Sequence, residues 1–309
     1  MLLMKNVNKS NNKKPMISIG VPVFNGQETL SAALKSITEQ SFDDIEIIIS
    51  DNASTDDTQK ICRSYAAEND QIKYIRQQKN IGAIANFKYV LSEACGDYFI
   101  WAAADDIRSA DYLKLNYDFL QDNPNYVASG TPNGFDNWPS SKELVKFSIE
   151  EDEVFKRHLK FFNNCFQSHG LFYCLFRTKI LTDSDILDDI FSNSDWLGFD
   201  WATILHLLTI GKINRTLKGS MTFGVRGESS KNIFRIHSHT KIEKFIPFYV
   251  LSKLVMKITR DFTTWQKIRI LYILVKLNCF AFLDPIYRAQ KNFLYKIYCK
   301  YLKSKIKSL

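Results

Sequence analysis

Three apolar runs in the first 106 residues, each followed at once by polar side chains, constrain the fold of this chain more than any other feature. They span residues 17–23, 45–50 and 98–102, and Ile and Val make up most of the first two, as in parallel strands that are buried on both faces. Segments with the spacing of amphipathic helices separate the runs, beginning with residues 30–37. Strands that alternate with helices predict an α/β fold with a Rossmann-like, mostly parallel central sheet and flanking helices.

The polar side chains that follow these runs include Asn25, Asp51 and Asp105. The carboxyl ends of parallel strands meet at one edge of a sheet, and ligands of open α/β sheets bind in the crevice outside that edge. We therefore expect the three side chains to lie on the rim of one pocket. Carboxylates beside backbone amides suit a nucleotide whose phosphates arrive with a divalent metal ion.

The alternation of predicted strands and helices is less regular after Asp106 than before it. A further strand is expected at residues 72–76, and a further helix around residues 84–94. Beyond Asp106 we expect, in chain order, a helix over residues 111–120, a loop over 129–142, a helix over 154–162, a strand over 171–176, a helix over 201–208, and helical faces at 242–249 and 293–302.

Charge is distributed unevenly along the chain, whose net charge is +8. Residues 241–309 contain 15 Lys and Arg but only three Asp and Glu, whereas residues 1–240 are net acidic. We predict a disordered lead over residues 1–14, a globular domain over 15–240 and a basic tail of amphipathic helices over 241–309. The apolar faces of the tail favour an anionic membrane surface, and not nucleic acid, as its partner.

No segment of this sequence has the pattern of an export signal or of a membrane-spanning helix. The apolar run from Met1 to Met4 is too short for a signal peptide, and no stretch of about 18 residues is apolar and free of charge. The six cysteines have no metal-binding spacing, which fits reduced thiols. These features predict a cytoplasmic protein that is peripheral on the inner face of the cell membrane.

The three polar strand ends, taken in order, resemble the nucleotide-sugar-binding half of family 2 glycosyltransferases, which have the GT-A fold. The resemblance covers about residues 16–230 and is strongest up to Asp106. It implies that residues 15–106 bind the sugar donor and that residues 107–240 bind the acceptor. The Gln-x-x-Arg-Trp motif of processive members is absent, which favours the bacterial type that transfers a single sugar.

The resemblance also implies which residues bind the donor. Asp51 lies where family members bind the nucleobase, and a carboxylate accepts a hydrogen bond from the imide N–H of uracil or thymine. The other positions that match donor-binding segments of the family are Pro22, Phe24, Asn25, Asn80, Gly82, Asp105 and Arg226.

Asp105 matches the second Asp of the Asp-x-Asp motif with which family members coordinate Mn²⁺ or Mg²⁺ on the donor diphosphate. The first Asp of that motif is replaced by Ala103, and Asp106 is a second candidate ligand. A hard divalent ion that is held mainly by substrate phosphates needs only one or two protein carboxylates. Because Ala103 has no carboxylate, this position lacks the group that would anchor the ribose and add to the affinity for the metal.

The catalytic base implied by the resemblance is Asp200, which precedes Gly211 by eleven residues, as in the family's pattern of an acidic residue, a helix and a glycine. Asp195 is the competing choice, and either residue could instead serve only as an N-terminal cap of a helix. A catalytic base must remove the proton of the acceptor hydroxyl as that hydroxyl attacks.

These residues together imply an inverting, metal-dependent glycosyltransferase. It would transfer one sugar from a UDP- or dTDP-sugar to a glycan or lipid-linked acceptor in cell-surface polysaccharide synthesis. A nucleotidyltransferase is one alternative, although its usual Gly-rich, basic first loop is missing. A non-catalytic sugar-nucleotide-binding or scaffold protein is the other, and the replacement at Ala103 favours it; turnover of labelled donors separates it from an enzyme.

Overall fold

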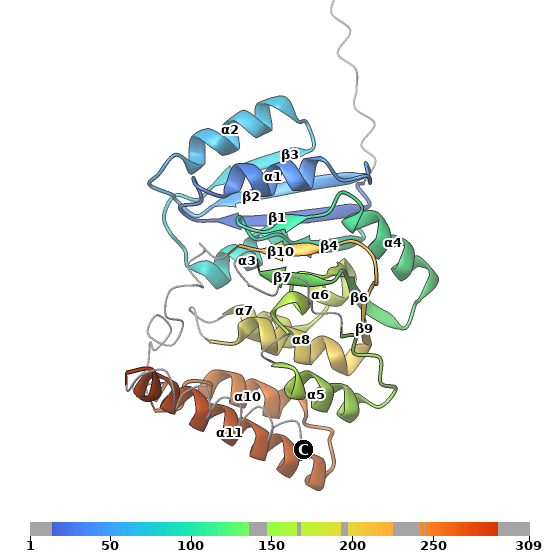
Figure 1. Cartoon of the computed structure of the whole chain (residues 1–309), viewed down its shortest axis with the longest axis vertical. Coiled ribbons are helices and arrows are strands. Elements are labelled where there is room, and N and C mark those ends of the chain that lie inside the picture. Colours follow the sequence, from blue (N-terminus) through green and yellow to red (C-terminus); the bar gives the residue numbers. More distant parts are fainter. Residues whose placement is uncertain are drawn as a thin grey trace, which may run out of the picture.

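The computed structural model describes residues 14–135, 147–165, 168–192, 197–224, 242–243 and 245–289 of the 309-residue chain. Its central sheet has seven strands in the order β3-β2-β1-β4-β8-β6-β9 (Figure 1). The strands span Ile17–Val23 (β1), Ile45–Asp51 (β2), Ile72–Arg76 (β3), Tyr98–Trp101 (β4), Tyr126–Gly130 (β6), Leu175–Arg177 (β8) and Lys212–Arg215 (β9). Neighbours are parallel except that β8 is antiparallel to both β4 and β6. The predicted mostly parallel sheet is therefore confirmed.

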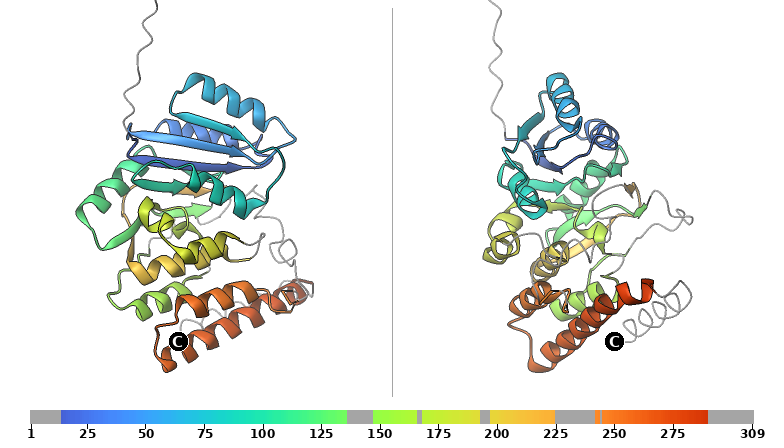
Figure 2. Two further views of the ribbon diagram at one scale, coloured as in Figure 1. Left: turned by 180° about the vertical axis from the view of Figure 1, so that it is seen from behind. Right: turned by 90° about the vertical axis from the view of Figure 1, so that its left-hand side faces the viewer.

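Helices cover both faces of this sheet (Figure 2). They span Leu30–Thr38 (α1), Thr58–Glu68 (α2), Ala83–Ser92 (α3), Tyr112–Asp122 (α4), Val154–Asn163 (α5), Thr178–Thr182 (α6), Asp185–Ser192 (α7), Phe199–Ile210 (α8), Tyr249–Ile258 (α10) and Thr264–Ala289 (α11). Successive side chains of a strand point to opposite faces, so Ile47 packs in the core with Leu34 of α1, and Ile48 packs in the core with Val90 of α3. Burial on both faces explains why these strand sequences are almost continuously apolar.

A second, smaller sheet links the end of β4 to distant parts of the chain. Its strands are Ile107–Arg108 (β5), Asn133–Phe135 (β7) and Met221–Phe223 (β10), in the order β5-β10-β7. Because β5 begins two residues after Asp105 and β10 ends just before Gly224, this sheet brings the residues after β10 beside the loop after β4.

The C-terminal helices form a layer at the end of the molecule opposite to β3 (Figures 1 and 2). Helix α10 packs on α8, where Phe248 stacks on Trp201 with ring centroids 5.5 Å apart, and α11 packs on α10. None of the helices in the described part of the chain combines the length and the apolar character that crossing a bilayer requires.

Two expectations for the middle of the chain are wrong. The loop expected over residues 129–142 contains the end of β6 and all of β7. Both strands are short and buried, so the hydrogen bonds and packing that they gain from neighbouring strands outweigh the turn preference of Gly130 and Pro132. The strand expected over residues 171–176 begins only at Leu175, because residues 169–171 form a 3₁₀ turn.

The helical face expected at residues 242–249 is also wrong. Residues 242, 243, 245, 247 and 248 lie in turns, and α10 begins only at Tyr249. Pro247 lacks an N–H and disfavours helical conformation at the preceding Ile246, so the helix starts after it. The second expected face, at residues 293–302, lies outside the described residues, as does the lead over residues 1–13.

Candidate functional site

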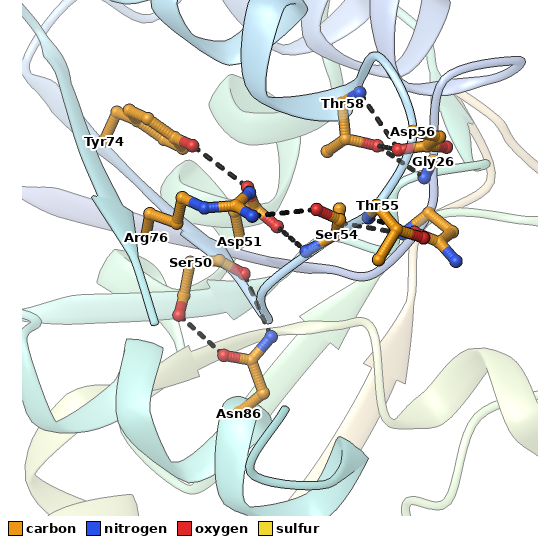
Figure 3. A network of polar contacts seen from close by, with 11 residues as sticks. Gly26, Ser50, Asp51, Ser54, Thr55, Asp56, Thr58, Tyr74, Arg76 and Asn86 are labelled. Atoms are coloured by element: carbon orange, nitrogen blue, oxygen red, sulfur yellow. Dashed lines mark hydrogen bonds and ion pairs between the residues drawn. The ribbon is translucent and has the colours of Figure 1, made fainter. Parts of the chain in front are cut away.

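The polar ends of β1 and β2 are locked to each other by hydrogen bonds. The backbone N–H of Asn25 donates to Oγ of Ser54 at 2.9 Å, and the backbone N–H of Thr55 donates to Oδ1 of Asn25 at 2.9 Å. Asn25 and Ala53 adopt left-handed backbone conformations, with φ of 51° and 60°. These tight turns hold the two strand ends as one rigid rim (Figure 3).

Asp51 is the centre of a buried polar network in this rim (Figure 3). Its Oδ1 accepts from the backbone N–H of Ser54 at 2.8 Å, and its Oδ2 accepts from the Tyr74 hydroxyl at 3.0 Å and from Nη1 of Arg76 at 2.6 Å. Burial and the Asp51 carboxylate raise the pKa of Tyr74 to about 12, so the hydroxyl stays protonated and donates. The sequence prediction missed both partners, although their alternate positions at the end of a strand beside Asp51 are a usable signal.

Asn52 connects the same rim to the loop at residues 80–82. Its Nδ2 donates to Oδ1 of Asn80 at 3.0 Å and to the carbonyl of Gly82 at 3.2 Å, and its Oδ1 accepts from the backbone N–H of Ile81 at 2.8 Å. Gly82 has φ of 89°, a conformation that favours glycine. Asn52 therefore brings Asn80 and Gly82 to the edge where Asn25 and Asp51 lie.

Two aspartates follow β4, and the carboxylate of one is accessible whereas that of the other is buried. Asp105 is half-buried, whereas Asp106 is only 2% exposed. Oδ1 of Asp106 accepts from the backbone N–H of Gly224 at 3.3 Å. Burial raises the pKa of Asp106 to about 7, against the opposing charge of Arg108. The two adjacent aspartates thus occupy different environments.

Gly224 packs directly against Asp105. A Cβ built on Gly224 lies 2.4 Å from the carbonyl oxygen of Asp105 and 2.6 Å from its Cβ and its Oδ2. Only glycine fits there without displacing Asp105, so β10 fixes the position of this carboxylate. The sequence prediction did not include Gly224, because its contact depends on the pairing of β10 with β5.

Across the small sheet, Asp200 lies in the first turn of α8. Gly198, with φ of 93°, turns the chain into this helix. Burial raises the pKa of Asp200 to about 6, although hydrogen bonds from backbone N–H groups partly oppose the increase. At neutral pH most of this carboxyl group is ionised, so it can accept a proton.

Tyr173 follows the 3₁₀ turn at residues 169–171. Burial and the negative charges of Asp106, Asp200 and Asp105 raise the pKa of its hydroxyl well above the usual value. Its ring packs against Phe223 of β10, with centroids 5.8 Å apart. The hydroxyl of Tyr173 therefore stays protonated at neutral pH. The sequence prediction placed Tyr173 inside a strand and gave it no role.

The other expected site residues are distributed as follows. Pro22 is buried in β1 opposite Ser50 of β2, and the Phe24 side chain is 38% exposed beyond the end of β1. Asp195 and Arg226 lie outside the described residues. Among the described residues, no group of three or more His, Cys, Asp or Glu side chains could hold a metal ion by itself. A divalent cation at Asp105 would therefore need ligands from a substrate.

Comparison with known sequences gives a family match over residues 18–184, to the family described as Glycosyl transferase family 2. The chain is 28% identical over 236 residues to the GalNAc(5)-diNAcBac-PP-undecaprenol beta-1,3-glucosyltransferase of Campylobacter jejuni, which covers 72% of this chain and 71% of that protein. It is 35% identical over 121 residues to EpsE of Bacillus subtilis, covering 39% of this chain. The matched stretch spans 44% of the length of EpsE.

Solved structures resemble the chain over most of its length. S. aureus TarS 1-349 in complex with UDP-GlcNAc has a TM-score of 0.61 at 18% identity, covering 86% of this chain and 73% of that one. The mannosyltransferase PcManGT from Pyrobaculum calidifontis, in complex with GDP-Man and Mn²⁺, has a TM-score of 0.55 at 15% identity, covering 94% and 79%. At these identities the likeness concerns the fold alone.

Proposed function

The chain belongs to glycosyl transferase family 2, and on that premise we propose that it transfers one sugar from a UDP- or dTDP-sugar to a glycan or lipid-linked acceptor with inversion at the anomeric carbon. The predicted GT-A fold is confirmed. The observation that carries the proposal is the hydrogen-bonded edge of the sheet, where Asn25, Asp51 and the loop at residues 80–82 are held together. A donor site at this edge, with Asp105 after β4 as the metal ligand and Asp200 of α8 as the base, suits a single displacement.

In this proposal the donor nucleotide lies on the rim formed by β1, β2 and the loop at residues 80–82. Asp51 contacts the nucleobase, since its Oδ1 accepts one hydrogen bond from the protein and has capacity for a second. The partly exposed Arg76 covers this carboxylate and must adjust when the base binds. Pro22, Phe24, Asn25, Asn80 and Gly82 complete the donor contacts, and Arg226 contacts the diphosphate.

We assign the divalent ion, Mn²⁺ or Mg²⁺, to Asp105. The half-buried carboxylate held by Gly224 fits a hard cation, and donor phosphates supply the further oxygen ligands. When bound, such an ion neutralises the charge that develops on the leaving diphosphate. Asp106, the second predicted ligand, is buried against β10, and we assign it the role of holding Gly224 and thereby Asp105.

The chemical step needs a base on the acceptor side. Asp200 accepts the proton of the acceptor hydroxyl, and the oxygen attacks the anomeric carbon while the bond to the diphosphate breaks on the opposite face. A carboxyl group with a pKa of about 6 is ionised at neutral pH and is more basic than an ordinary aspartate. Tyr173 stays protonated and donates a hydrogen bond to the acceptor.

The proposal also assigns a role to each part of the chain. Residues 15–106 form the donor-binding half, residues 107–240 form the acceptor-binding half, and residues 241–309 form a basic tail that binds an anionic membrane. In this proposal the protein lies on the inner face of the cell membrane, where a lipid-linked acceptor is accessible. Asp195 remains the alternative base if Asp200 serves only as a helix cap.

Donor screening tests the proposal. A UDP- or dTDP-sugar with Mn²⁺ should raise the Tm more than the same donor with EDTA, because a ligand at a hundredfold excess over Kd stabilises the folded state by about 2.7 kcal/mol. Asp51→Ala should lose most of this increase, whereas Asp118→Ala, an exposed substitution on α4, should keep it. Transfer of labelled sugar separates the enzyme from the scaffold alternative, which binds donor without turnover. Equal stabilisation and equal transfer in EDTA would contradict the metal assignment.

A further inference from the structure

Exposed apolar side chains are concentrated in the C-terminal layer of the molecule. Of the 14 large hydrophobic side chains that are exposed in the described part of the chain, ten lie between residues 242 and 282. They are Ile242, Phe245, Ile246, Tyr249, Trp265, Ile268, Leu271, Tyr272, Val275 and Phe282. Contiguous exposed apolar patches mark interaction surfaces, whereas single exposed side chains are ordinary.

Helix α11 has two apolar faces. One face, which includes Ile270, Ile273, Leu274 and Leu277, is buried on the rest of the protein. The other carries Trp265, Ile268, Tyr272 and Val275, at intervals of three and four residues, and these side chains are 61%, 61%, 47% and 52% exposed. We call this second set the outer face of α11. A helix needs only one apolar face to pack on its own domain, so the outer face requires a different partner.

The charges on α11 indicate the chemistry of that partner. From Thr264 to Leu283 the helix contains Lys267, Arg269 and Lys276 and no acidic residue. The guanidinium of Arg269 lies over the Trp265 ring at 5.4 Å, and Nζ of Lys276 lies over the Tyr272 ring at 4.3 Å. Cations thus flank the aromatic side chains of the outer face, a combination that suits the headgroup region of an acidic bilayer.

We propose that the outer face of α11 lies in the surface of an anionic membrane, with Trp265, Ile268, Tyr272 and Val275 at the boundary between headgroups and acyl chains. This inference rests on the membrane-binding role proposed above for residues 241–309, and it names the helix face that performs that role. Helix α11 is the outermost element of the C-terminal layer, far from β3 and α2 (Figures 1 and 2). Membrane binding there places α5 and α8 between the bilayer and the strands β1, β2 and β3 (Figures 1 and 2).

A second copy of the chain is a less suitable occupant of this face. A two-fold contact places the same surface of both subunits together. The Lys and Arg side chains along α11 would then approach like charges, with no acidic residue of the helix between Thr264 and Leu283 to compensate them. An acidic lipid surface instead supplies the complementary charge.

The test uses the full chain and vesicles of phosphatidylcholine with phosphatidylglycerol. A variant with Trp265→Ser, Ile268→Ser and Val275→Ser should bind these vesicles at least about tenfold more weakly in flotation. A matched control with Ile210→Ser and Leu217→Ser removes exposed apolar side chains elsewhere, which are 51% and 83% exposed, and should bind like the unmodified protein. Vesicles of phosphatidylcholine alone should bind less protein, and salt should release only part of it.

The spectroscopic result follows from the same geometry. The emission of Trp265, obtained as the difference between the protein and its Trp265→Phe variant, should shift to shorter wavelength on binding vesicles.

Equal flotation of the triple variant and the control overturns the proposal. So does a concentration-dependent dimer that the triple substitution dissociates, since the face would then bind a second copy. Transfer to a soluble acceptor is measured separately, so that a failure of membrane binding is distinguished from a failure of the proposed activity.

Discussion

Substitution of Gly224 by alanine should damage the site without removing any functional side chain. The new Cβ would lie within 2.6 Å of the carbonyl oxygen, Cβ and Oδ2 of Asp105, and a change of the Asp105 rotamer can move Oδ2 but neither the carbonyl oxygen nor Cβ. The backbone of β10 or of the loop after β4 must therefore shift. Displacement of a catalytic group by about 1 Å costs about 10²-fold in rate. We expect kcat/KM for sugar transfer to fall by about that factor, and the Mn²⁺ concentration for half-maximal activity to rise.

Gly20→Ala is the matched control for this experiment. The atoms nearest to a Cβ on Gly20 would be side-chain atoms of Val90 and Phe99 in the core, at 2.7 and 2.8 Å. Both substitutions overpack the protein, at a cost of about 1–3 kcal/mol, and both should lower the Tm. Only Gly224→Ala should change the metal requirement. Equal activity and equal metal dependence of the two variants would refute the view that Gly224 positions Asp105.

Three further predictions concern Asp200, Tyr173 and Arg76. Because the Asp200 pKa is about 6, kcat/KM should fall tenfold per pH unit below about pH 6. This pKa lies above the ordinary 3.8, so Asp200 stabilises the folded state at low pH and loses that stabilising contribution as the pH rises through about 6. Asp200→Asn should therefore raise the Tm at pH 7, measured by calorimetry. Tyr173→Phe should lower kcat about tenfold with unchanged donor Kd, and a weakened Kd with unchanged kcat would contradict its role in the reaction. Arg76→Ala should lower the donor affinity about tenfold, because it removes the charged partner of buried Asp51. Lys73→Ala breaks the exposed ion pair with Glu93 and should leave the donor affinity unchanged. Titration calorimetry measures both affinities.

The first half of the fold could be predicted from the sequence because the positions that are apolar in the sequence are also the positions that are buried in the structure. The run at residues 17–23 is β1, and residues 72–76 are β3. The helix expected over residues 30–37 is α1, and its apolar positions are buried. The strands β1, β2 and β4 are buried along almost their whole length, so their apolar runs identify them without knowledge of their partners.

The second half depends on contacts that the sequence does not display. The strand β7 contains Gly134 and follows Pro132, so its composition indicates a loop, and only pairing with β10 makes it a strand. Asp105 and Asp106 look alike in the sequence, and the hydrogen bond from Gly224, more than a hundred residues away, is what distinguishes them. The role of Tyr173 likewise requires α8 and the loop after β4 to be placed in space.

The most direct test of the account is sugar transfer by the Asp200→Asn variant, with the product followed by NMR. The unmodified protein with a UDP- or dTDP-sugar, Mn²⁺ and a lipid-linked acceptor should form a glycoside whose anomeric configuration is opposite to that of the donor. Asp200→Asn should keep the donor Kd and lose transfer, because a base acts on the acceptor proton and not in donor binding. Near-normal turnover by this variant, or a product that retains the donor configuration, would contradict the proposed mechanism.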